Sequence, residues 1–136
     1  MENESPGFIS RTELPFEVID QGHHGNFTKP IELQIGTQKA LDEIYATINS
    51  TRTPSESAPK IDFSKYWVGF VGLGEKNTGG YSVKVKHVVR SGYETTVELE
   101  ATEPNGMATM VITSPYVIFK VEQQANAMKF KYVSSN

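Results

Sequence analysis

The sequence predicts a mainly β protein of the α+β class, an antiparallel sheet or sandwich with one α-helix near residues 38–48. The first observation is that apolar and polar residues alternate through much of residues 81–101, the period of a half-buried strand. The second is a single change to a helical period at residues 38–48. With 136 residues and a 38% hydrophobic share, the chain has the size and composition of one domain with one core.

The N-terminal part begins with polar residues that follow no apolar period, so we expect residues 1–15 to form a flexible segment. A single β-rich domain is then expected over residues 16–136. Its first two strands are predicted at residues 16–20 and 31–35, with a loop between them.

The helix is predicted from the positions of its apolar residues. Leu41, Ile44, Tyr45 and Ile48 are spaced i, i+3, i+4 and i+7, so they form one stripe that must be buried. Thr37 is a suitable cap, and the Pro-rich and Ser-rich residues 49–60 are expected to form a surface loop.

The central hairpin can be sized from the rule that directly opposed residues share a face. Odd-numbered residues are mostly apolar both in 81–89 and in 93–101, which favours a three-residue loop at 90–92 that pairs Val89 with Tyr93 and Val85 with Val97. The same rule predicts a loop at 104–106 that places Met107 opposite Glu103.

Residues 107–113 are apolar on both faces, which predicts a central strand or a strand covered by the helix, and we favour the helix. Further strands are expected in the remaining apolar segments. With those already described they make about six to eight strands, and they lie at residues 66–73, 116–121 and 128–133.

Composition excludes several classes of function. The net charge of -3 and pI near 5.6 provide no positive field for phosphates, so nucleic acid is not an expected partner. The absence of cysteine excludes disulfides and thiolate chemistry, and no apolar run approaches the ~20 residues of a transmembrane helix.

No combination of residues predicts a catalytic, metal or cofactor site, so we expect no enzyme. His23 and His24 are adjacent and point apart on an extended chain, which argues against a metal pair. His87 is expected on the inward face of its strand, and the carboxylates near Glu98 are expected on a solvent face opposite lysines such as Lys84.

The segment 74–81 stands out because two consecutive glycines, Gly79 and Gly80, permit a backbone path closed to other residues. It is either a plain turn or a binding loop. Together with residues 61–65 and 113–118, which read Ile-Asp-Phe-Ser-Lys and Thr-Ser-Pro-Tyr-Val-Ile, this segment resembles the C-terminal domain of the protease complex subunit PrcB family, over about residues 61–121.

The resemblance implies an exported accessory protein of the bacterial envelope or extracellular space, with a possible lipid anchor on the native precursor, and no enzyme activity. A weaker similarity is to chagasin-type protease inhibitors, which present a Thr-Gly-Tyr loop beside a glycine-containing loop.

In a meander of antiparallel strands alternate connections share one end, so the loops 74–81 and 103–107 should emerge together. The sequence thus predicts a non-catalytic module that binds a protein partner, with a protease as the candidate, through these two loops. Two alternatives stay open: a direct protease inhibitor of chagasin-like mode, and a structural β module of the envelope. The expected partner-binding residues are Asn77, Thr78, Gly79, Gly80, Tyr81, Asn105, Gly106 and Met107.

Overall fold

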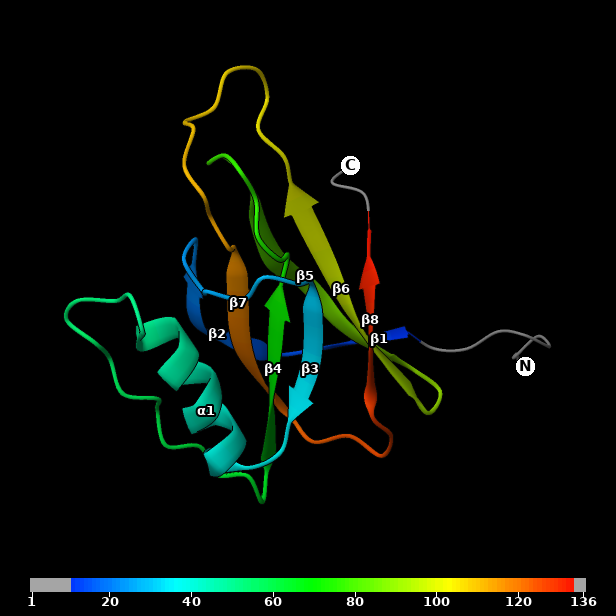
Figure 1. The fold of residues 1–136 in the computed structure, drawn as a ribbon. Coiled ribbons are helices and arrows are strands. Elements are labelled where there is room, and N and C mark those ends of the chain that lie inside the picture. Colours follow the sequence, from blue (N-terminus) through cyan, green and yellow to red (C-terminus); the bar gives the residue numbers. More distant parts are fainter. Residues whose placement is uncertain (1–10, 134–136) are drawn as a thin grey trace.

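The computed structural model describes residues 11–133 and confirms a mainly β fold with one helix (Figure 1). Within this range, no helix is both long and apolar enough to pass through a membrane. The elements are β1 (Arg11–Leu14), β2 (Phe16–Gly22), β3 (Ile31–Ile35), α1 (Gln38–Asn49), β4 (Tyr66–Gly72), β5 (Ser82–Ser91), β6 (Glu94–Thr102), β7 (Tyr116–Glu122) and β8 (Met128–Tyr132).

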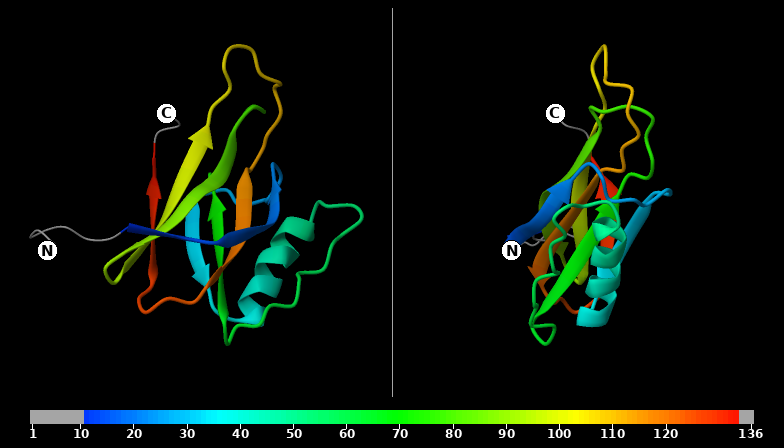
Figure 2. Two further views of the ribbon diagram at one scale, coloured as in Figure 1. Left: turned by 180° about the vertical axis from the view of Figure 1, so that it is seen from behind. Right: turned by 60° about the vertical axis from the view of Figure 1, so that its left-hand side comes forward.

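The strands form two four-stranded sheets, ordered β1-β5-β6-β8 and β2-β7-β4-β3. All pairs are antiparallel except β6 with β8, which is parallel. Helix α1 covers the outer face of the second sheet, which makes three layers (Figure 2). The predicted up-and-down meander is therefore wrong, because the chain crosses between sheets after β4 and after β6.

The middle layer is apolar on both faces because it is covered on both faces. Alternate residues of β4 and β7 point toward the helix, where Phe70 and Ile118 pack, or toward the other sheet, where Val71 and Phe119 pack. Within this sheet, the ring of Phe119 lies over Gly69, its partner on the neighbouring strand, and a Cβ on Gly69 would lie 2.2 Å from that ring.

Helix α1 confirms the predicted stripe and cap. Thr37 accepts a hydrogen bond from the amide of Ala40 at 3.2 Å, and the four predicted stripe residues are the buried ones. At the other end, the Asn26 side-chain amide donates to the carbonyls of Thr47 and Ile48 at 3.1 and 3.2 Å. This residue from a distant loop therefore satisfies two carbonyls of the last helical turn.

The predicted register of the central hairpin is wrong. Ser91 pairs with Glu94 across a two-residue turn, in which Gly92 has a φ of 65°. A β-bulge at residue 86 then shifts the register, so that Val85 pairs with Leu99 whereas Val88 pairs with Val97. The extra residue moves the core-facing positions of β5 from odd (Val83, Val85) to even (Val88), which the simple odd-with-odd rule cannot anticipate.

Three side chains of this hairpin differ from the prediction as a result. Tyr93 lies in the turn and is 81% exposed. His87 is partly exposed and its Nδ1 lies 3.3 Å from a carboxylate oxygen of Glu13. Lys84 lies opposite Glu100, with 3.3 Å between the Nζ and Oε1 atoms, and not opposite Glu98 as expected.

The N-terminal prediction needs a correction as well. Residues 11–14 form β1, which pairs with β5 and adds an ion pair of 2.9 Å between Arg11 and Glu98. The prediction of a flexible segment over residues 1–15 is therefore wrong for residues 11–14. Residues 1–10 of that segment lie outside the described part of the chain.

The predicted strand at 107–113 does not form. This segment is a long connection from β6 to β7, only Thr113 within it makes an isolated bridge, and it is not covered by the helix. Its apolar residues suggested burial on two faces, but no neighbouring strand is available to pair with it. The prediction therefore fails for lack of a partner strand.

Candidate functional site

Two loops project together beyond one end of the sheets and form a surface that we call the tip. The tip consists of residues 73–81, between β4 and β5, and residues 103–115, between β6 and β7 (Figure 1, top). The β5–β6 turn lies at the opposite end of the molecule, in both views of Figure 2 as well. The predicted adjacency of the two loops is confirmed, although the meander that suggested it is wrong.

Backbone hydrogen bonds join the loops near their bases. Lys76 and Thr113 exchange two amide–carbonyl bonds of 2.8 Å, and the amide of Gly79 donates to the carbonyl of Thr109 at 2.9 Å. The Thr113 hydroxyl adds a bond of 2.9 Å to the carbonyl of Thr78. The two loops therefore act as one unit, and each of them connects one sheet to the other.

The two glycines of the motif have different roles. Gly80 has a φ of 92°, and a Cβ there would lie 2.6 Å from the Cβ of Pro104. A Cβ on Gly79 would meet nothing closer than 3.8 Å. Only Gly80 is thus required by the backbone path and by the close approach of the second loop.

The other predicted binding residues also lie on the tip. Tyr81 is partly buried, with the Lys76 ammonium 5.0 Å from its ring centroid, a cation–π distance. Asn77, Asn105 and Gly106 are exposed, and Met107 is 101% exposed. The structure therefore brings all eight predicted residues to one end of the molecule, and their role in binding stays a prediction.

The base of the tip is held by Ser114, which is buried. Its hydroxyl donates to the carbonyl of Phe27 at 2.9 Å and accepts from the amide of Phe27 at 3.1 Å. Its backbone amide donates to the carbonyl of His23 at 2.7 Å, and its carbonyl accepts from Gly25 at 2.8 Å. Ser114 thus connects the tip to the loop after β2, which gives the Thr-Ser-Pro-Tyr motif a structural role.

The sequence reasoning missed the most prominent part of the tip. Met110 is 83% exposed, Ile112 61% and Val111 42%, so together with Met107 the second loop exposes four large apolar side chains. The amide of Val111 donates to the carbonyl of Thr109 at 2.9 Å, which closes a tight turn with Met110 at its centre. An uncharged run from Pro104 to Pro115, apolar on both faces, is the sequence signal that could have identified a binding loop.

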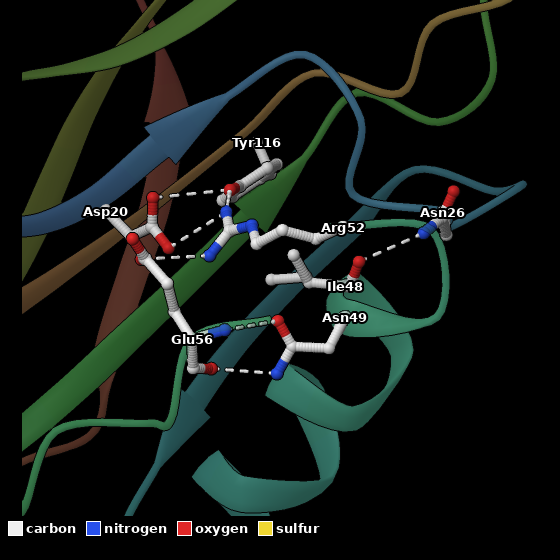
Figure 3. A network of polar contacts seen from close by, with 7 residues as sticks. All are labelled: Asp20, Asn26, Ile48, Asn49, Arg52, Glu56 and Tyr116. Atoms are coloured by element: carbon white, nitrogen blue, oxygen red, sulfur yellow. Dashed lines mark hydrogen bonds and ion pairs between the residues drawn. The ribbon is translucent and has the colours of Figure 1, made fainter. Parts of the chain in front are cut away.

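A network of polar side chains lies beside the tip and includes Tyr116, the first residue of β7. Arg52, in the loop after the helix, donates hydrogen bonds to the Tyr116 hydroxyl and to Asp20, and its other terminal nitrogen pairs with Glu56 at 3.2 Å (Figure 3). Burial, followed by the negative charge of Asp20, raises the pKa of Tyr116 to about 12. The hydroxyl therefore stays protonated at neutral pH and donates to Asp20 at 3.2 Å.

The contacts of this network are structural. The guanidinium of Arg52 is balanced by two carboxylates, so it carries no free positive charge toward the cavity of about 420 Å³ beside it. His23 and His24 line that cavity, but within residues 11–133 no three His, Asp or Glu side chains gather as a metal site would require. The network fixes the loop after α1 to the second sheet.

Comparison with known families supports the resemblance seen in the sequence. Residues 68–122 match the family model described as PrcB C-terminal. The match includes the glycine loop and the Thr-Ser-Pro-Tyr motif, whereas residues 61–65 precede it. No curated protein and no solved structure matches the chain, and the similarity to chagasin-type inhibitors has no support from these comparisons.

Proposed function

We propose that this chain, whose residues 68–122 match the PrcB C-terminal family, is a non-catalytic accessory module that binds a protein partner through the tip. The family match supports a domain associated with a protease complex, and we therefore propose a protease or a protease-bound protein as the partner. We further propose that the protein is exported and works at the bacterial envelope or outside the cell.

The observation that carries the proposal is the exposed apolar surface of Met107, Met110, Val111 and Ile112. Monomeric proteins rarely expose a contiguous apolar patch without a use for it, and aromatic and methionine side chains are enriched in binding surfaces. Burial of these four side chains by a partner would remove them from water and stabilise a complex.

The charge distribution defines the chemistry of the partner. No charged residue occurs between Glu103 and the end of the second loop at residue 115, so the surface that meets the tip should be apolar and uncharged at its centre. Lys76 and Glu75 lie at the side of the tip, on the first loop, where they can contribute to specificity at the rim.

The tip is also held in a defined conformation before a partner arrives. Its two loops are joined by backbone bonds, and Ser114 ties their base to a third loop. A surface that is already ordered loses less conformational entropy on binding, so its affinity is higher than that of a flexible loop of the same composition.

The test places a photo-crosslinking amino acid in the full chain, at position 110 in one variant and at position 93 in another. Each variant is then irradiated in the native envelope fraction. Met110 and Tyr93 are similarly exposed, 83% and 81%, but they lie at opposite ends of the molecule. We expect one protein to crosslink from position 110 and not from position 93. The adduct should disappear in an excess of wild-type chain and persist in an equal excess of a Met110→Asp chain that still folds. Equal crosslinking from both positions contradicts the proposal and favours a structural β module.

Direct inhibition of a protease is the second candidate, because Thr78, Gly79, Gly80 and Tyr81 lie beside the loop of residues 104–106 at the tip. This candidate differs from the first in that the purified chain alone should slow substrate cleavage. A panel of cysteine, serine and metallo-proteases assayed with the chain in excess separates the two. If the chain crosslinks from position 110 but inhibits none of these proteases, direct inhibition is wrong and the accessory-module function is supported.

A further inference from the structure

Among residues 11–133, the sulfur atoms are distributed unequally between the surface and the core. The chain contains no cysteine and four methionines, so methionine carries all of its sulfur. Met107 and Met110 are 101% and 83% exposed on the tip, whereas Met128, at the start of β8, is 7% exposed and packs in the core between the sheets. Oxidants in solution therefore reach sulfur at the tip before they reach it in the core.

We propose that Met107 and Met110 are modification sites, and that their oxidation to methionine sulfoxide by a peroxide changes the tip from an apolar to a polar surface. The effect on partner binding rests on the function proposed above. In the reaction a sulfur lone pair attacks one peroxide oxygen and the O–O bond breaks. The sulfur is oxidised by two electrons to S=O, and hydrogen peroxide is reduced to water.

The position of Met110 favours this chemistry. The Thr109–Val111 turn holds the residue at the centre of a tight bend, and its side chain is 83% exposed. An added oxygen at this place meets solvent, so the oxidised side chain is accommodated without disturbance of the core. The modification therefore acts on the surface and leaves the fold unchanged.

The consequence follows from the composition of the tip. A sulfoxide oxygen is a strong hydrogen-bond acceptor, and its burial in an apolar partner surface without a donor costs at least as much as a lost hydrogen bond. Oxidation of these two residues thus removes part of the apolar area and adds two unsatisfied acceptors. Methionine sulfoxide reductases reverse the reaction, which makes the change a switch and not only damage.

The first experiment treats the folded, full-length chain with hydrogen peroxide and follows oxidation at each methionine by peptide mass spectrometry. We expect Met107 and Met110 to gain one oxygen at least about tenfold faster than Met128, because reactivity follows exposure. Circular dichroism of the oxidised protein should match that of the untreated protein. Equal rates at all three positions, or a loss of structure at the same rate as oxidation, overturn the proposal.

The second experiment measures the apolar surface directly, by retention on a phenyl-substituted chromatography matrix. Peroxide should shorten the retention of the wild-type chain. It should leave that of a Met107→Leu/Met110→Leu variant unchanged, because leucine preserves the apolar surface and has no sulfur. Unchanged retention of the oxidised wild-type chain overturns the proposal whether or not a partner is known.

The third experiment repeats the position-110 crosslinking reaction as a competition. Untreated wild-type chain and the untreated or oxidised double variant should compete equally, whereas oxidised wild-type chain should compete about tenfold less well or worse. If no untreated chain competes, the proposed binding function is wrong while the outcome of the other two experiments still decides the oxidation sites. If oxidised and untreated wild-type chains compete equally, the switch is wrong and the binding function stands.

Discussion

Gly80 and Pro104 lie so close together that a Cβ on the glycine would stand 2.6 Å from the Cβ of the proline. These residues belong to loops that leave different sheets, and their contact is one of the points where the two halves of the tip meet. The backbone of the first loop passes Pro104 only because residue 80 has no side chain and adopts a φ of 92°.

The two adjacent glycines should therefore respond differently to alanine. We expect Gly80→Ala to lower the free energy of unfolding by about 1–3 kcal/mol, because it combines a backbone strain with a contact that must shift. Gly79→Ala, whose new Cβ would meet only ordinary contacts beyond 3.8 Å, should change it by less than about 0.5 kcal/mol. Urea unfolding measures both, and a larger effect at position 79 would show that the contact with Pro104 is unimportant.

Ser114 should be required for the order of the loop after β2. Ser114→Ala removes the bonds of 2.9 and 3.1 Å to the backbone of Phe27 and leaves two partly buried backbone groups without their partner, at a cost of about 1–3 kcal/mol. Hydrogen exchange at the Phe27 amide should accelerate in this variant. Ser55→Ala, in the exposed loop after the helix, is the control and should leave both stability and exchange unchanged.

Because the pKa of Tyr116 is raised, we expect the free energy of unfolding to fall at alkaline pH. Burial and then the charge of Asp20 raise its pKa from 10.0 to about 12 in the folded protein, so the folded state holds the proton more tightly than the unfolded chain. The contribution of this group is complete below pH ~10 and is lost as the pH rises from about 10 to about 12.

Tyr116→Phe tests this pH dependence because phenylalanine has no proton to lose. The difference in unfolding free energy between the wild-type chain and the variant should be constant below pH ~10 and should shrink above it. Urea unfolding at several pH values measures the difference. A constant difference up to pH ~12 would contradict the raised pKa.

The ring of Phe119, on the strand paired with β4, lies over Gly69 and leaves no room for a side chain there. Gly69→Ala places a Cβ 2.2 Å from the Phe119 ring, and we expect a loss of about 1–3 kcal/mol or more from the forced repacking. Phe119→Leu in the same chain should restore part of this loss, which a double-mutant cycle measures. Gly36→Ala, with nothing within 4 Å of its new Cβ, is the matched control.

Much of the fold could be predicted because local periodicity reports which residues are buried. The helix, its Thr37 cap and the strands β3, β4 and β7 were predicted within a residue or two of their observed bounds. Residues 107–113 failed because an apolar segment reads as a strand whether or not a neighbouring strand exists to pair with it. For the same reason the exposed side chains of Met110 and Ile112 were not predicted as part of the site.

The sequence by itself determined the helix, the alternation of the strands and the glycine pair at positions 79 and 80, because each depends on residues close together in the chain. Only the tertiary structure decided which sheet each strand joins, the bulge at residue 86 and the exposure of Met110. These features depend on which distant segments meet, and many pairings of the same segments satisfy the same local pattern. The tip therefore became visible only when the two connections between the sheets were placed side by side.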